Sequence, residues 1–158
     1  MNTAAESAAR AVHVRPVQSS DEAGWRTLYQ GYRDFYAQPD RPEAITAVWR
    51  WLMDPDHEER GLVAERAGEL LGLANFRSFS RPIAASHGLF LDDLFTSPTA
   101  RGSGAATALL HRLAEIARDE GATLVRWITA DDNETARRLY DKEAKLTPWM
   151  TYDLPPAP

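Results

Sequence analysis

Cysteine is absent from this chain of 158 residues. The absence excludes a disulfide framework, thiolate zinc sites and a cysteine nucleophile, and it agrees with a reducing compartment. We therefore expect a cytoplasmic protein. Four histidines are present without metal-ligand spacing, so we expect no metal site; they are His13, His57, His87 and His111.

Long apolar runs are also missing. No segment approaches the ~20 apolar residues that cross a bilayer, and residues 1–10 lack the basic start and apolar run of a signal peptide. We expect residues 1–10 to form a disordered tail, residues 155–158 to form a short proline-rich tail, and the protein to have no membrane partner. The net charge of −5 disfavours a nucleic-acid partner.

What remains is the composition of one globular domain. The chain is 44% hydrophobic and 26% charged, and its length suits a single core. We therefore predict one domain over residues 11–154.

Hydrophobic periodicity predicts the order of elements along this domain. Alternation indicates strands, spacing of three and four residues indicates helices, and glycine or proline marks the boundaries. The prediction is a strand near 12–17, a helix capped by Ser20, a helix from Pro42 to before Pro55, strands at 61–66 and 69–76 around an Ala67-Gly68 turn, a strand at 88–95, a helix from Gly104 to before Gly121, a strand at 123–128, a helix capped by Asp132 or Asn133, and a last strand at 149–152. This order predicts an α/β (α+β) fold with a mixed central sheet and helices on both faces.

An aromatic stripe lies on the first predicted helix, and an apolar stripe lies on the second. The first contains Trp25, Leu28, Tyr29, Tyr32, Phe35 and Tyr36. Core packing is the favoured interpretation, and the lining of a substrate cleft is the alternative. On the second helix Trp49 and Trp51 point in different directions, and an exposed Trp51 could mark a dimer surface or an acceptor pocket.

The segment Arg101–Thr107 has the local chemistry of a phosphate site. It leads from a strand into a helix, where backbone amides have no acceptor within the helix. Gly102 and Gly104 allow close approach, Ser103 adds a hydroxyl, Arg101 adds positive charge, and Ala105 and Ala106 are too small to obstruct a ligand. A pyrophosphate group fits this description, although a purely structural loop is an alternative.

This segment resembles the pyrophosphate loop of the GNAT (GCN5-related N-acetyltransferase) superfamily, with the pattern Arg/Gln-x-x-Gly-x-Gly/Ala. Arg101, Gly104 and Ala106 match it, and Asn133, Ala136 and Tyr140 match a later signature of the superfamily. The resemblance covers about Leu89 to Tyr140. In the N-terminal half only the order of elements agrees.

The resemblance implies that acetyl-CoA is the cosubstrate, and it implies which residues of this chain contact acetyl-CoA. Backbone near Leu94, Phe95 and Thr96 would pair with the pantetheine arm, and the amides from Ser103 to Thr107 would hold the pyrophosphate. Asn133 resembles a residue that contacts the cofactor arm or a bound water, and Tyr140 resembles the acid that protonates the leaving thiolate. The alternatives are a plain helix cap for Asn133 and a core tyrosine for Tyr140.

Asp92 and Asp93 stand in the middle of the predicted strand at 88–95. An alkylamine is protonated at neutral pH, so a carboxylate near the acceptor is needed to remove a proton. Strand alternation predicts that only one of the two faces the cleft. We favour Asp92, acting through water, because Leu91–Phe95 resembles the Leu-Glu-Asp-Phe-Phe run of diamine acetyltransferases. Alternatively, both acids are structural and pair with an arginine such as Arg77 or Arg126.

The combined hypothesis is an N-acetyltransferase that moves an acetyl group from acetyl-CoA to a primary amine by direct attack. A small diamine or polyamine is favoured as acceptor. Dimers are common in the resembled superfamily, which implies a homodimer for this chain. Alternatives are a non-catalytic acyl-CoA-binding regulatory module and acetylation of a peptide amine. A nucleotide site is disfavoured because the Rossmann fingerprint and the P-loop lysine are missing.

Overall fold

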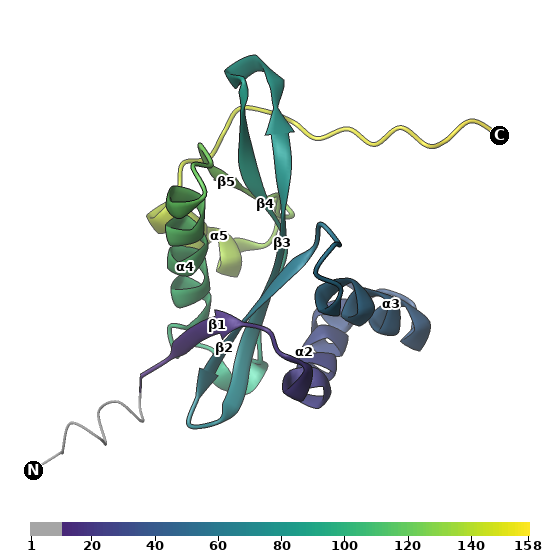
Figure 1. Ribbon diagram of the computed structural model, residues 1–158, viewed down its shortest axis with the longest axis vertical. Helices are drawn as coiled ribbons and strands as arrows, with labels where there is room; N and C mark the ends of the chain where they lie inside the picture. Colours follow the sequence, from purple (N-terminus) through teal and green to yellow (C-terminus); the bar gives the residue numbers. More distant parts are fainter. Residues whose placement is uncertain (1–10) are drawn as a thin grey trace, which may run out of the picture. The chain divides into compact units, whose positions relative to one another are not determined.

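The computed structural model describes residues 11–158 in two compact units, one ending at Ile128 and the other beginning at Thr129. The first unit contains a five-stranded sheet of order β1-β2-β3-β4-β5 (Figure 1). Its elements are β1 (His13–Pro16), a 3-10 turn (Ser19–Asp21), α2 (Glu22–Phe35), α3 (Pro42–Met53), β2 (Arg60–Arg66), β3 (Glu69–Arg81), a 3-10 turn (Pro82–Ala84), β4 (Ser86–Thr96), a 3-10 turn (Pro98–Ala100), α4 (Ala105–Asp119) and β5 (Val125–Arg126). The predicted fold class is confirmed.

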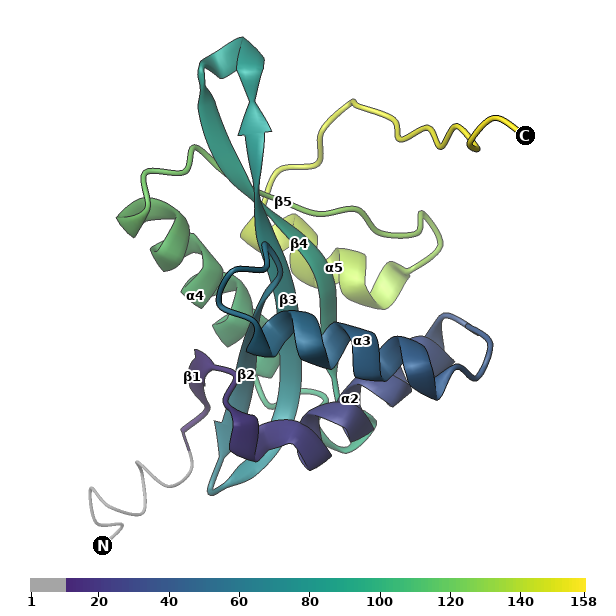
Figure 2. The same ribbon diagram turned by 45° about the vertical axis from the view of Figure 1, so that its right-hand side comes forward.

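The sheet is mixed. Strands β1 to β4 pair antiparallel in chain order, whereas β4 and β5 pair parallel. The β2–β3 turn places Ala67 at φ 52° and Gly68 at φ 81°, as a two-residue hairpin turn with two positive φ angles requires. Helix α4 lies on one face of the sheet, and α2 and α3 lie on the other (Figures 1 and 2).

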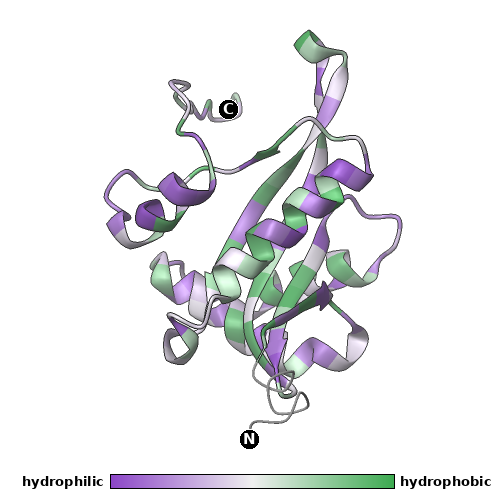
Figure 3. Cartoon of the chain, turned by 90° about the vertical axis from the view of Figure 1, so that its left-hand side faces the viewer, coloured by the Kyte–Doolittle hydropathy of each residue, from purple (hydrophilic) through white to green (hydrophobic). Residues whose placement is uncertain are grey.

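Helix α4 buries one stripe of small and aliphatic side chains, and Figure 3 shows it crossing the sheet with alternating polar and apolar bands. The buried side chains are Ala105, Leu109, Leu110, Leu113 and Ala117. The helix ends in a Schellman motif, in which Gly121 (φ 71°) donates to the Arg118 carbonyl at 3.2 Å and Ala122 donates to the Ala117 carbonyl at 2.8 Å. The predicted glycine terminator is confirmed.

A second group of buried side chains, on the opposite face of the sheet from α4, lies under α2 and α3. Trp25 is fully buried and stacks on Tyr29 with ring centroids 4.7 Å apart, and Trp49 lies 5.3 Å from Trp25. The aromatic stripe of α2 is core only in its first half, because Phe35 and Tyr36 are 54% and 41% exposed. Trp49 and Trp51 do point in different directions: Trp49 is buried, whereas Trp51 is 45% exposed.

The start of α2 differs from the prediction. Ser20 lies in a 3-10 turn, and the helix begins after Asp21. The Asp21 carboxylate accepts the Gln18 backbone N–H at 2.7 Å and forms a two-atom ion pair with Arg15. The acid replaces the serine at this turn because its carboxylate reaches both the Gln18 amide and the guanidinium.

Two predicted strands need correction. The strand at 123–128 is reduced to Val125–Arg126, and the predicted strand at 149–152 is absent. Trp149, Met150 and Tyr152 have strand-forming side chains, but they are 80%, 79% and 88% exposed. Extended backbone becomes a strand only when a partner supplies ladder hydrogen bonds, and these residues have no such partner in the part of the chain that the structure describes.

The second unit contains one helix, α5 (Glu134–Glu143), within its described residues. Asn133 is its N-cap, and the Asn133 Oδ1 accepts the Ala136 backbone N–H at 3.3 Å. The helix ends without glycine because Ala144 is extended (φ −146°) rather than left-handed. Residues 1–10, where a disordered tail is predicted, lie outside the described residues. No described helix is long and apolar enough to cross a membrane.

Candidate active site

A β-bulge on β4 brings the two aspartates to one cluster of acidic groups. Asn75 pairs with Asp93 and Phe76 pairs with Leu91, so Asp92 is an extra residue without a partner on β3. A bulge interrupts the alternation of side chains along a strand. The charges of both carboxylates raise the pKa of the same neighbour, Glu59. That only one aspartate faces the cleft stays a prediction.

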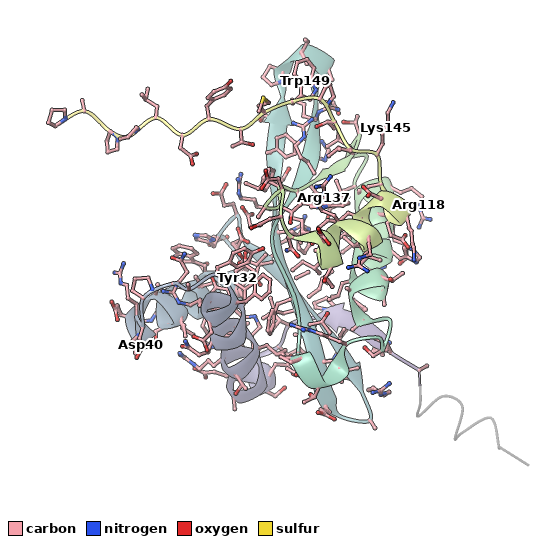
Figure 4. All side chains as sticks on the ribbon, turned by 180° about the vertical axis from the view of Figure 1, so that it is seen from behind. Tyr32, Asp40, Arg118, Arg137, Lys145 and Trp149 are labelled. Atoms are coloured by element: carbon pink, nitrogen blue, oxygen red, sulfur yellow. The ribbon has the colours of Figure 1, made fainter. Side chains whose placement is uncertain are left out.

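Asp93 is held by hydrogen-bond donors from two elements. The Asn75 side-chain amide on β3 donates to Asp93 Oδ2 at 3.0 Å, and the hydroxyls of Tyr29 and Tyr32 on α2 donate to the same carboxylate. Figure 4 labels Tyr32 on the side of α2 that faces the sheet. Desolvation raises the pKa of Asp93 above its usual range, although the three donors oppose the shift.

Asp92 is paired with an arginine, as the structural alternative predicted. Its Oδ2 lies 3.1 Å from Arg77 Nε on β3. Arg77 also lies over the Phe90 ring, 5.1 Å from the ring centroid. Despite this ion pair, desolvation and the charge of Asp93 raise the pKa of Asp92. Arg126, the other predicted partner, instead covers the Phe79 ring at 5.4 Å.

Glu59 is a member of this cluster that the sequence analysis missed. It precedes β2, and the charges of Asp92, Asp93 and Arg77 act on its carboxyl group. Desolvation and the two aspartates raise the pKa of Glu59 to about 8. No local pattern marks it, because Glu58 beside it is equally acidic and only the pairing of distant strands distinguishes the two.

Next to this cluster, one edge of β4 is open. The β4–β5 ladder is limited to Leu89↔Val125 and Phe90↔Arg126. Beyond Phe90, this edge has no strand partner among the described residues of the first unit. Leu94, Phe95 and Thr96, the predicted pantetheine contacts, lie in that stretch, and Thr96 Oγ1 is buried without a hydrogen-bond partner.

The predicted pyrophosphate loop has the geometry of an anion site. Gly102 and Gly104 have φ angles of 77° and 84°, and a Cβ at either position would meet no atom within 4 Å. Gly104 caps α4, so the amides of Ala105, Ala106 and Thr107 form the first turn. Ser103 Oγ accepts the Ala105 N–H at 3.3 Å, and Arg101 is exposed. This open backbone surface, with first-turn amides and an adjacent cation, fits a pyrophosphate group.

Comparison with known proteins identifies the family of this chain. The model of the acetyltransferase (GNAT) family matches residues 25–144. The chain belongs to the GNAT family. It is an acetyl-CoA-dependent N-acetyltransferase.

Relatives of this acetyltransferase cover most of its length. It is 30% identical over 131 residues to the uncharacterized N-acetyltransferase YhfO of Bacillus subtilis, covering 83% of this chain and 87% of that protein. It is 26% identical over 141 residues to the D-amino-acid N-acetyltransferase HPA3 of Saccharomyces cerevisiae, covering 88% of each. A ribosomal-protein-alanine N-acetyltransferase from Brucella melitensis has the same fold, with a TM-score of 0.79 and 23% identity over 92% of this chain and 99% of that one.

The two remaining predicted site residues of the acetyltransferase lie in its second unit. Asn133 serves as the cap of α5, which is the structural alternative considered for it. Tyr140 lies near the end of α5 and is partly buried, and its carbonyl accepts the Ala144 N–H at 2.8 Å. Among residues 11–158, no group of three or more His, Asp or Glu side chains is arranged to hold a metal ion.

Proposed function

We propose that this acetyltransferase moves the acetyl group of acetyl-CoA to a small primary amine, with a diamine or polyamine favoured. The observation that carries the proposal is the placement of Asp92 and Asp93 at the β4 bulge, where Arg77 is the cation that pairs with Asp92. When both aspartates are ionised beside this one cation, the site has an excess of negative charge, which attracts a cationic amine. A D-amino acid, the acceptor in the name of HPA3, brings its own carboxylate, and the cluster offers it only one cation, which already pairs with Asp92.

In the proposed reaction, Asp92 removes a proton from the acceptor ammonium, directly or through water. The N–H bond breaks, the electron pair stays on nitrogen, and the amine attacks the acetyl carbonyl of the thioester. Bound acetyl-CoA supplies an activated acyl group with a thiolate leaving group. As the C–S bond breaks, Tyr140 protonates the departing sulfur, and the second N–H proton of the attacking nitrogen restores the tyrosine hydroxyl. The pKa of Asp92 is raised by desolvation, which makes its carboxylate a stronger base than an exposed aspartate.

For the cosubstrate, the proposal assigns the pyrophosphate to the backbone of Arg101–Thr107 and the pantetheine arm to the open edge of β4 at Leu94–Thr96. The positive φ angles of Gly102 and Gly104 and the limited β4–β5 ladder support these assignments. Asn133 is proposed to contact the cofactor arm or a bound water, in addition to its cap. A homodimer and a cytoplasmic location stay predictions from the sequence.

The test is thiol release from acetyl-CoA across diamines, polyamines, D- and L-amino acids, aminoglycosides and a short peptide, with a parallel calorimetric titration of CoA. Asp92→Asn and Tyr140→Phe should each lower amine-dependent release by about 100-fold or more while CoA still binds. The matched controls are Asp56→Asn and Tyr152→Phe, at exposed positions. CoA binding without release for any amine would favour the regulatory module, and preference for a D-amino acid would contradict the proposed acceptor class.

A further inference from the structure

Gly31 lies in the interior of α2, where glycine is a poor helix former. Glycine is less favourable than alanine inside a helix because its flexible backbone loses more entropy on folding. The φ angle of Gly31 is not positive, so the backbone conformation does not require glycine at this residue. Glycine at this position therefore indicates that a neighbouring group occupies the space of a side chain.

That neighbouring group is the ring of Phe95 on β4. Helix α2 packs on β3 and β4 (Figure 2). A Cβ on Gly31 would lie 2.9 Å from Phe95 Cζ and 3.0 Å from Phe95 Cε1. Non-bonded carbon atoms approach one another to about 3.5 Å. The substitution Gly31→Ala would therefore displace the ring or the helix by about 0.5 Å.

The Phe95 ring has little freedom to move away from α2. It lies edge-on to Tyr32, with ring centroids 6.2 Å apart and an interplanar angle of 71°, and it packs against a cluster of buried side chains. The members of that cluster are Trp25, Leu28, Tyr29, Ile45, Trp49, Val63 and Leu73. Close-packed interiors transmit a displacement rather than absorb it. A displacement of the ring therefore reaches the backbone of Phe95.

The backbone of Phe95 is closely packed as well, against β3. A Cβ on Gly72 would lie 2.7 Å from the Phe95 carbonyl oxygen and 3.4 Å from Thr96 Oγ1. Gly72 is paired with Thr96 in the β3–β4 register. Two glycines on different elements thus hold Phe95, because Gly31 leaves space for its ring and Gly72 leaves space for its carbonyl group.

Phe95 belongs to the open edge of β4. Leu94, Phe95 and Thr96 lie beyond Phe90, where this edge has no strand partner among the described residues of the first unit. We propose that Gly31 is a positioning residue for acetyl-CoA: the space that it leaves for the Phe95 ring sets the path of the β4 backbone that pairs with the pantetheine arm. This rests on the proposed function, which assigns the arm to that edge. Gly31 needs no contact with acetyl-CoA and acts through Phe95.

Helix α2 contains a matched control for this contact. A Cβ on Gly24 would lie 2.9 Å from Leu70 Cδ1, which is as close as the approach at Gly31. Leu70 pairs with Glu65 of β2 and precedes the part of β3 that pairs with β4. Gly24→Ala therefore makes the same chemical change in the same helix, without a contact to the open edge of β4.

The experiment compares the affinity for CoA of the wild type, Gly31→Ala and Gly24→Ala by calorimetry, and the KM for acetyl-CoA and for the amine. Gly31→Ala should weaken CoA binding and raise the KM for acetyl-CoA by about tenfold, while the KM for the amine changes less than about twofold. Gly24→Ala should stay within about twofold of the wild type in all three quantities. Equal CoA affinities in the two variants would overturn the proposal.

ADP separates an effect on the arm from a general distortion, because it has a pyrophosphate group but no pantetheine. Its affinity is measured by competition with CoA. Gly31→Ala should bind ADP as the wild type does, since the loop Arg101–Thr107 is unchanged. A loss of ADP affinity as large as the loss of CoA affinity would contradict a role of Gly31 toward the arm.

Phe95→Leu tests whether Gly31 acts through the ring. Leucine lacks the two ring atoms that approach Gly31, so adding Gly31→Ala to Phe95→Leu should weaken CoA binding by less than about twofold. Phe95→Leu by itself should weaken CoA binding about threefold, because the ring no longer fixes the β4 backbone. A wild-type affinity of Phe95→Leu would refute the proposal even if Gly31→Ala did not fold.

The wild type and Gly104→Ala distinguish this proposal from the proposed function. If the wild type binds no CoA, the proposed function is wrong whatever Gly31 does. If the wild type binds CoA, Gly104→Ala weakens that binding and Gly31→Ala does not, the role of Gly31 alone is refuted.

Discussion

The side-chain amide of Asn75 donates to Asp93 Oδ2 at 3.0 Å. This pair lies next to the β-bulge that interrupts the regular pairing of β3 with β4. Asn75 is fully buried, and its strand partners are Gly61 on β2 and Asp93 on β4. This pair connects the core of the sheet to the acidic cluster.

Asn75→Ala should lower the free energy of unfolding by about 2 kcal/mol, because it removes the Asn75 donor from the buried Asp93 carboxylate and opens a small cavity. Urea denaturation measures the loss. In the Asp93→Asn background the same substitution should cost less, since the charged acceptor is already gone. Equal costs in both backgrounds would show that the hydrogen bond contributes little.

Gly104→Ala should weaken CoA binding by about tenfold, because a residue with a Cβ resists the φ of 84° at the cap of α4 and shifts the first-turn amides. Gly68→Ala is the matched control: its φ is 81° and its Cβ would also meet open space, but it lies in the β2–β3 turn. Both variants should lose about 1 kcal/mol of stability. Calorimetry with CoA should separate them, and equal affinities would exclude the loop as the pyrophosphate site.

Asp21→Asn should destabilise the protein at pH 7 by about 2 kcal/mol, because the 93% buried Asp21 carboxylate pairs with Arg15 and accepts the Gln18 amide. The Arg15 guanidinium holds the pKa of Asp21 below its usual range. A lowered folded-state pKa contributes stability above pH about 4 that is lost as pH falls. The difference between variant and wild type should therefore shrink below pH 4 in chemical denaturation, whereas a difference independent of pH would point to packing.

Trp25→Ala should cost about 4 kcal/mol, because Trp25 is fully buried between Tyr29 and Trp49. Trp51→Ala, on the exposed side of α3, should cost less than about 1 kcal/mol. The two unfolding curves are compared under one condition. Similar losses would mean that the stacking of Trp51 on His57 stabilises the fold far more than its exposure suggests.

Local patterns predicted the elements whose signals are contained within a few residues. Three such elements are confirmed: the Ala67-Gly68 turn, the Gly104 cap and the Gly121 terminator. Each depends on a positive φ angle at a residue whose type can be read directly from the sequence. The strand predicted at 149–152 was wrong because strand propensity says nothing of whether a partner edge is present.

The acidic cluster shows the same division. The sequence by itself determined the glycine loop before α4 and the two aspartates on β4, because these motifs are contiguous and their chemistry is local. Only the tertiary structure decided that a bulge lies at Asp92 and Asp93, that Asn75 donates to Asp93, and that the charges of both aspartates act on Glu59. Strand register and helix packing bring these groups together, and both are set by the burial of the whole core rather than by any segment alone.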